Sequence, residues 1–315
     1  MSFLSPPVPA ATDDPSEHAD WLELTALLST THSVSVQDFM SSLGIGGSLD
    51  ALAEILEDGT PDSDDEVSEP LAEAAFSEVD ERVRACGGQS GSYPFVLAEN
   101  SLSLKPNGND SIYVFLMLLA YYGGNAGPDG TATKLFEELS ANALKAYLGS
   151  GSPLMNTEAF GFPRSYKEKN FAEALNKLCK DIGEGIGHSG AYEIPVQKDA
   201  KLDIVGWKEF EDRQIGKIIV FGQCATGKWS DKVSELPEPS KWCGYWMRQV
   251  PTVLPLRSFF VPHCIPRKRW RFVCQFGGIL FERCRIAHLL SNVDAQLSIR
   301  CSNWTRDLLV GAPVK

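Results

Sequence analysis

Positive charge is missing from the first part of this 315-residue chain. Residues 1–81 contain 19 Asp and Glu but no Lys or Arg, whereas residues 82–315 contain all 29 Lys and Arg together with 22 Asp and Glu. A positively charged surface can therefore come only from the later part of the chain. The net charge of −12 hides this division and indicates two regions with different electrostatic roles.

Paired cysteines, a long apolar run and a leader segment are also missing. The eight Cys are scattered and form no C-x-x-C pair, which predicts reduced thiols in a reducing compartment for a chain large enough to fold without disulfides. The most apolar segment, residues 111–122, is shorter than the ~20 residues that span a membrane. Residues 1–18 lack the basic and apolar parts of a signal peptide. We therefore expect a cytoplasmic protein that does not enter a membrane.

The carboxyl-terminal Cys and His raise the question of a zinc site. The residues concerned are His263, Cys264, Cys274, Cys284 and His288. The cysteines are spaced ten residues apart and fall on predicted strands, unlike the short spacings of structural zinc sites. The pattern favours buried thiols.

Residues 1–58 predict an acidic helical extension. Apolar residues have helical spacing in residues 21–28 and again in residues 49–56. Residues 59–70 are too polar and charged to bury much surface and are interpreted as an acidic linker. Two roles fit the extension: it is an appendage that binds a partner protein or aids solubility, or it folds over the basic part of the chain as a nucleic-acid mimic and restrains it.

Residues 71–165 are predicted to be mainly helical. Helical patterns cover residues 71–86, 111–122 and 131–148, and residues 92–104 are typical of one or two short strands. Residues 149–163 are rich in Gly and Pro and are interpreted as a loop, whose end is a candidate to approach a functional site.

Residues 166–224 predict a helix followed by three strands. The helix ends at Gly183, and the strands cover residues 191–196, 201–207 and 217–224. Asp203 and Gln223 then lie on neighbouring strands, and Glu184 follows the helix end. Three oxygen-bearing side chains could converge on one hard cation.

The stretch GAYEIPVQKDAKLDIVGW, residues 190–207, resembles the Mrr-like branch of the PD-(D/E)xK restriction-endonuclease superfamily. The resemblance covers about residues 181–232 and implies an α/β fold, a restriction-endonuclease-like core of a mixed sheet flanked by helices, in residues 166–315. It implies that Glu184, Asp203 and Gln223 bind Mg²⁺ or Mn²⁺, with the backbone carbonyl of Cys224 as a further candidate ligand. It also leaves open a homodimer.

The chain departs from the family pattern at one position. The family has a Lys two residues after the Gln, where this chain has Ala225. The candidates for a relocated cation are Lys228, which we consider first, then Lys232 and Lys201. A catalytic Lys helps to stabilise charge that develops on the phosphate, so its loss would cost about 2–4 kcal/mol if nothing replaced it.

Two other phosphate-binding patterns occur in the same segment. Residues 222–228 match the G-x-x-x-x-G-K spacing of a P-loop, but Trp229 stands where a Ser or Thr should contact Mg²⁺. Residues 185–190 match G-x-G-x-x-G but follow a helix and precede a strand, the reverse of the dinucleotide-binding order. The first remains an alternative, and the second is interpreted as a turn.

The last 75 residues contain 12 basic and 3 acidic residues. The densest cluster is Arg267, Lys268, Arg269, Trp270 and Arg271, which suits a surface that follows a phosphate backbone and stacks on a base. The alternative is a solvated turn between strands at residues 258–262 and 271–274. A further strand is predicted at residues 278–281 and a closing helix at residues 283–291.

Together these features predict a metal-dependent nuclease that hydrolyses phosphodiester bonds in nucleic acid, DNA before RNA. By analogy of fold, its setting would be a bacterial defence or restriction system. The alternative is a catalytically inactive nuclease-fold protein that binds nucleic acid or scaffolds a defence complex.

Overall fold

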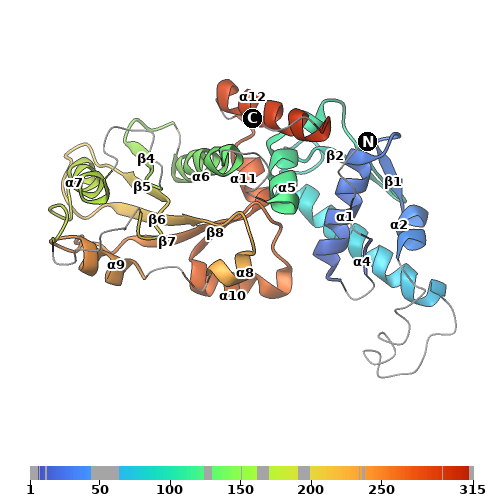
Figure 1. Cartoon of the computed structure of the whole chain (residues 1–315), viewed down its shortest axis with the longest axis horizontal. Coiled ribbons are helices and arrows are strands. Elements are labelled where there is room, and N and C mark those ends of the chain that lie inside the picture. The colour runs from blue at the N-terminus through green and yellow to red at the C-terminus, as the bar shows by residue number, and fades with distance from the viewer. Residues whose placement is uncertain are drawn as a thin grey trace, which may run out of the picture.

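A five-stranded mixed sheet, built mainly from apolar segments, lies in the later part of the chain (Figure 1). The computed structural model describes residues 6, 8–10, 13–43, 64–123, 130–149, 151–161, 170–190, 199–233, 235, 238–292 and 294–311. The sheet has the order β4-β5-β6-β7-β8, from β4 (Met155–Ala159), β5 (Ile204–Lys208), β6 (Ile218–Cys224), β7 (Leu256–Phe260) and β8 (Ile279–Phe281). Strands β4, β5 and β6 run antiparallel, whereas β6, β7 and β8 run parallel.

The amino-terminal part of the chain combines helices with a small antiparallel sheet. This sheet has the order β1-β3-β2, with β1 at Ser33–Ser35, β2 at Phe95–Ala98 and β3 at Ser101–Leu104. The helices are α1 (Pro15–Leu28), α2 (Val36–Ser42), α4 (Asp64–Ala85) and α5 (Ile112–Tyr122), with a 3-10 turn at Gly108–Asp110. Helix α1 begins where Asp14 accepts the N–H of Ser16 and Glu17 accepts the N–H of Asp14, a capping box.

Helices cover both faces of the five-stranded sheet (Figure 1). Helix α6 (Thr131–Gly149) lies on one face, and α11 (Arg283–Leu289) and α12 (Ala295–Leu309) connect it to α5. On the other face, α7 (Phe171–Ile182) and α9 (Pro239–Trp246) pack against β5 and β6, while α8 (Trp229–Val233) and α10 (Arg267–Gly277) pack against β7 and β8.

Strand β6 shows how the sequence sets these two faces. Val220 belongs to the core on the α6 side, whereas Ile219 and Phe221 belong to the core formed with α7 and α9. Successive side chains of a strand point to opposite faces, so a strand buried on both faces reads as an apolar run.

The prediction of a mixed α/β protein with a mainly helical region early in the chain is confirmed. Helices α1, α4, α5, α6, α7 and α11 and strands β2, β3, β5, β6, β7 and β8 fall on segments predicted for them. The expected helix at residues 49–56 and the expected strand at residues 191–196 lie outside the described residues. Among the described helices, none is long and apolar enough to cross a membrane.

Three predictions of secondary structure are wrong. Residues 149–163 contain β4, the edge strand of the sheet, where we expected only a loop. Residues 271–274 lie in helix α10 and not in a strand. Helix α4 begins at Asp64, inside the predicted linker. Helix α12 has no counterpart among the predicted elements.

The predicted division of the chain also needs correction. A boundary between residues 165 and 166 would separate β4 from β5, although these strands are paired. Helix α1 is not an appendage, because Leu22 and Leu24 are fully buried in the same core as Trp304 near the other end of the chain. The described part of the acidic segment therefore belongs to the fold.

Candidate metal centre

Asp203 lies at the end of the sheet where β5 begins and β6 ends. Ile204 pairs with Gly222, so Asp203 is next to Gln223 on the neighbouring strand. The N–H of Asp203 donates to the carbonyl of Gly222 at 3.0 Å, and its Oδ2 accepts the N–H of Cys224 at 2.7 Å. Because strand N–H groups point along the sheet towards the neighbouring strand, this carboxylate lies near the plane of the sheet.

Glu137 of α6 meets Asp203 beside Gly161. A Cβ on Gly161 would lie 3.2 Å from Glu137 Oε2 and 3.3 Å from Asp203 Oδ1, so both carboxylates face the same small space. The N–H groups of Phe160 and Gly161 donate to the carbonyl of Asp203 at 2.7 and 2.9 Å. The end of the predicted loop therefore does approach the site, and only a Gly fits there without crowding the two acids.

Burial changes the acidity of both carboxyl groups. Burial raises the pKa of Asp203 to about 7, although the hydrogen bond from Cys224 acts in the opposite direction. Burial and the nearby charge of Asp203 raise the pKa of Glu137 to about 8. No described Lys or Arg forms an ion pair with either carboxylate. Two acids held together without a paired cation are costly to ionise, and they are the groups that a divalent cation would stabilise.

Gln223 lies on the opposite side of the sheet from Glu137. The thiol of Cys224 faces α6, where it hydrogen-bonds with Ser140 and where burial raises its pKa, so the alternation of the strand turns Gln223 away from α6. The Gln223 side chain is 5% exposed, and its Oε1 has no hydrogen-bond partner among the described residues. A buried oxygen of this kind calls for a ligand or water.

The structure does not bring Glu184 to this site. Glu184 accepts hydrogen bonds from the N–H groups of Gly216 and Thr252 at 3.1 and 2.6 Å. Gly216 precedes β6, whereas Asp203 lies at the far end of this strand, roughly 20 Å away by the rise per residue. The acid after α7 therefore lies among loops near the opposite end of the strands from Asp203.

Lys228 and Lys232 also point elsewhere. The side chain of Lys228 is 77% exposed and forms an ion pair with Asp231 at 3.5 Å. Lys232 forms an ion pair with Glu235 at 3.1 Å. Neither position supports a role beside the two carboxylates.

Lys201 is the candidate cation that acts on the site. Its positive charge lowers the pKa of Asp203 against the larger effect of burial, although its ammonium also lies 3.7 Å from Glu235. Lys134 of α6 has the same effect on Glu137. The structure thus adds Glu137 and Lys134 to the residues that sequence reasoning had proposed, and both were missed because β4 was not recognised as the strand that follows α6.

The two glycine-rich alternatives find little support in the local structure. The segment after residues 222–228 forms only the short helix α8, five residues long, whereas a P-loop needs a helix that offers its N–H groups to phosphate. Residues 185–187 all have positive φ, as expected for a tight turn.

The basic cluster forms the first turn of α10 and is partly neutralised. Arg267 forms an ion pair with Glu81 of α4, and Lys268 forms one with Asp14 at the start of α1. The Arg285 guanidinium lies 4.7 Å from the centre of the Trp270 ring, which limits stacking of a base on that face. Arg269 and Arg271 are exposed, so they are the members of the cluster best placed to contact a polyanion.

Comparisons with protein-family models, curated proteins and solved structures find no match for this chain. The chemistry of the site therefore rests on its own geometry.

Proposed function

We propose that this chain is a metal-dependent nuclease in which Glu137 and Asp203 hold Mg²⁺ or Mn²⁺ at the end of the sheet. The observation that carries the proposal is the pair of partly buried carboxylates beside Gly161, whose pKa values are raised to about 8 and about 7. Mg²⁺ is commonly bound by only one or two carboxylates, with waters and substrate phosphates as its other ligands. The pair suits such a site.

The residues around the pair have defined tasks in this proposal. The metal would activate a bound water and stabilise phosphate oxygens. The N–H of Cys224 fixes the orientation of Asp203, and Lys201 supplies positive charge in place of the Lys that Ala225 replaces. Gln223 offers its unpaired Oε1 to the substrate from the other face of the sheet. The mixed order of the sheet, with Asp203 and Gln223 on neighbouring strands, supports the expected restriction-endonuclease-like core.

The substrate that we propose is nucleic acid, with DNA before RNA, in a reducing cytoplasm and a bacterial defence setting. Arg269 and Arg271 extend from α10, which packs next to α8 on the face that carries Gln223. The eight cysteines are all free thiols, which suits a reducing compartment.

A second candidate is a nuclease-fold protein that binds nucleic acid without cutting it. The orientation of Lys228 away from the site favours this candidate, because the charge that develops on phosphate then depends on Lys201 alone. The two candidates differ in metal-dependent cleavage and share nucleic-acid binding.

The test is cleavage of plasmid, linear and single-stranded DNA and of RNA by the full chain, with Mg²⁺ or Mn²⁺ and with EDTA. We expect cleavage that requires metal and is lost in Asp203→Asn and Glu137→Gln. Glu138→Gln is the matched control, because Glu138 is the next residue of α6 and its carboxylate pairs with Arg300 at 2.6 Å. Cleavage that persists in both site variants would refute the site, and binding without cleavage by the native chain would establish the second candidate.

A further inference from the structure

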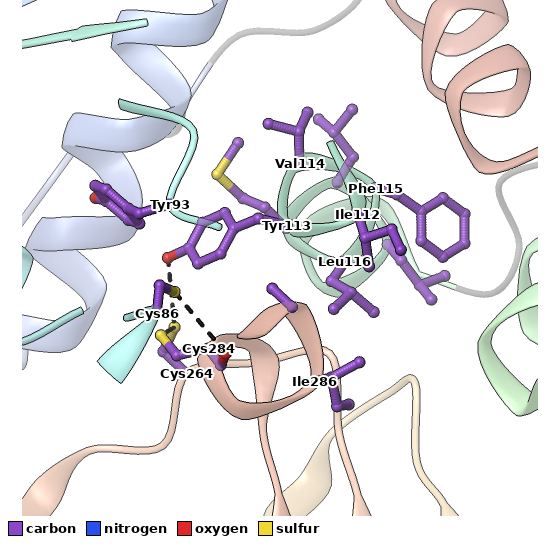
Figure 2. Close-up of a cluster of buried hydrophobic side chains, with 14 of the residues drawn as sticks. Cys86, Tyr93, Ile112, Tyr113, Val114, Phe115, Leu116, Cys264, Cys284 and Ile286 are labelled. Carbon is purple, nitrogen blue, oxygen red and sulfur yellow. Dashed lines mark hydrogen bonds between the residues drawn. The ribbon is translucent and has the colours of Figure 1, made fainter. Parts of the chain in front are cut away.

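Three cysteines gather beneath Tyr113 where the amino-terminal helices meet the sheet (Figure 2). Cys264 follows β7, Cys284 lies in the first turn of α11, and Cys86 follows α4. The Sγ atoms of Cys264 and Cys284 are 3.9 Å apart, and the Tyr113 hydroxyl lies 3.8 Å from Cys264 Sγ. All three thiols are buried.

Glu282 completes a set of three ligand atoms with Cys264 and Cys284. One carboxylate oxygen of Glu282 and the two sulfur atoms all lie within 4.8 Å of one another, the only such group of Cys, His, Asp and Glu among the described residues. The Glu282 oxygens accept the N–H groups of Cys284 and Arg285 at 3.0 and 2.9 Å, which orients the carboxylate. Each oxygen keeps a further lone pair for a cation.

We propose that Cys264, Cys284 and Glu282 bind a Zn²⁺ ion, with a fourth position open to the adjoining cavity. Tetrahedral zinc has Zn–S distances of about 2.3 Å, which places two sulfur ligands about 3.8 Å apart, close to the 3.9 Å separation found here. Two thiolates and one carboxylate also select zinc over Mg²⁺ or Ca²⁺, which prefer oxygen ligands alone.

The surroundings suit a site of this kind. A cavity of about 540 Å³ is lined by all three ligands and by Arg82 and the exposed Arg267, so a water or an anion can reach the fourth position. Zn²⁺ and two thiolates carry no net charge together, and binding therefore leaves the charge of the buried cluster unchanged.

The site differs from the pair of carboxylates in position and in ligand type, so the two proposals are independent. Zinc here would connect the end of β7 to the start of α11, beside α4 and α5. Arg283, between two of the ligands, is fully buried and bonded to Asp20 of α1 at 2.6 Å. The metal would thus stabilise the contact between the amino-terminal helices and the five-stranded sheet.

The test is metal content of the full chain purified with reductant, followed by replacement of the metal with Co²⁺. We expect one Zn²⁺ for each chain, and a Co²⁺ form with thiolate charge-transfer absorption and the visible bands of tetrahedral coordination. Cys284→Ser should remove the charge-transfer absorption, and Glu282→Gln, which keeps an oxygen to cap α11, should weaken Zn²⁺ binding by at least about tenfold.

Two controls separate this site from the rest of the chain. Cys274→Ser, at a half-buried thiol of α10, should leave zinc content unchanged, and Asp203→Asn should leave the Co²⁺ absorption unchanged. Absence of bound Zn²⁺ and Co²⁺ in the folded native chain would overturn the proposal. So would a Co²⁺ spectrum that survives in a folded Cys284→Ser protein, or a Cys264–Cys284 disulfide in the protein purified with reductant.

Discussion

Replacing Glu137 by Gln should stabilise the metal-free protein at alkaline pH. The pKa of Glu137 rises from 4.5 to about 8 in the folded protein, and a rise of this size corresponds to at most ~5 kcal/mol of cost when the folded carboxyl group must ionise. The amide of the variant carries no charge and avoids this cost. We expect the free energy of unfolding of Glu137→Gln to exceed that of the native chain by roughly 2–5 kcal/mol near pH 9 without metal.

The pH dependence has a defined sign. Between about pH 4 and pH 8 the unfolded chain releases the protons of Glu137 and Asp203 while the folded chain retains them, so stability falls as pH rises through this range. The difference in unfolding free energy between the variant and the native chain should therefore grow from about pH 5 to pH 9. Urea unfolding at several pH values, with Glu138→Gln as the control, measures this difference.

Metal should reduce the difference in unfolding free energy between the variant and the native chain. Mg²⁺ requires both carboxylates in the ionised form, so it should stabilise the native chain more near pH 9 than near pH 6 and should stabilise Glu137→Gln little. A Mg²⁺ concentration of 100 times the dissociation constant adds about 2.7 kcal/mol. A variant that is less stable than the native chain near pH 9 without metal, or one that gains as much from Mg²⁺, would refute the reasoning.

Four further substitutions test the site and the core. Gly161→Ala places a methyl group 3.2 and 3.3 Å from the two acids, so calorimetric titration should give Mg²⁺ affinity lowered about tenfold with little change in unfolding free energy; unchanged affinity would show that the metal lies elsewhere. Lys201→Ala should lower cleavage at least about tenfold and Lys228→Ala less than about twofold, and rate measurements that reverse this order would reinstate Lys228. Glu23→Gln should cost about 3–5 kcal/mol in urea unfolding, because Glu23 is fully buried and accepts the hydroxyls of Tyr93 and Tyr113; a loss below about 1 kcal/mol would contradict the role of this carboxylate.

Local patterns predicted the elements of the fold better than the partners of the site. Strands β5 and β6 are clear apolar runs, so Asp203 and Gln223 were expected on neighbouring strands, and the structure places the two residues next to each other. Strand β4 has the sequence MNTEA, with little apolar character, and it is formed by pairing with β5 and not by its own pattern. Because this strand was not predicted, α6 was not recognised as the helix before the sheet.

Glu137 was missed for the same reason. Within α6 it lies beside the buried residues Leu135, Phe136 and Leu139. The sequence of a helix does not show whether one acid among such residues faces a site or the solvent. Its approach to Asp203 depends on a contact between residues 66 positions apart in the chain. Glu184 had the more obvious position after a helix end, but it lies near the opposite end of the strands from Asp203.

The acidic amino-terminal segment forms both buried and exposed ion pairs, and the sequence alone does not distinguish them. Asp20 and Glu23 pair with the buried Arg82 and Arg283, which come from α4 and α11. Removing one partner of such a network leaves a buried charge without compensation. Deletion of residues 1–81 should therefore unfold the protein, as loss of cooperative urea unfolding would establish.

The outer ion pairs have a different energetic character. Lys268 and Arg267 are 68% and 64% exposed where they meet Asp14 and Glu81, and exposed pairs of this kind contribute little and weaken with salt. A polyanion could therefore displace these two acids from α10 without disturbing Asp20 or Glu23. The acids on the inner side of α1 therefore stabilise the fold. The exposed acids Asp14 and Glu81 instead compete weakly with a polyanion for the cations of α10. Replacing Asp14 by Asn, whose side chain still caps α1, should strengthen DNA retention at low salt but leave unfolding free energy almost unchanged, and equal retention by the two proteins would show that α10 does not contact DNA.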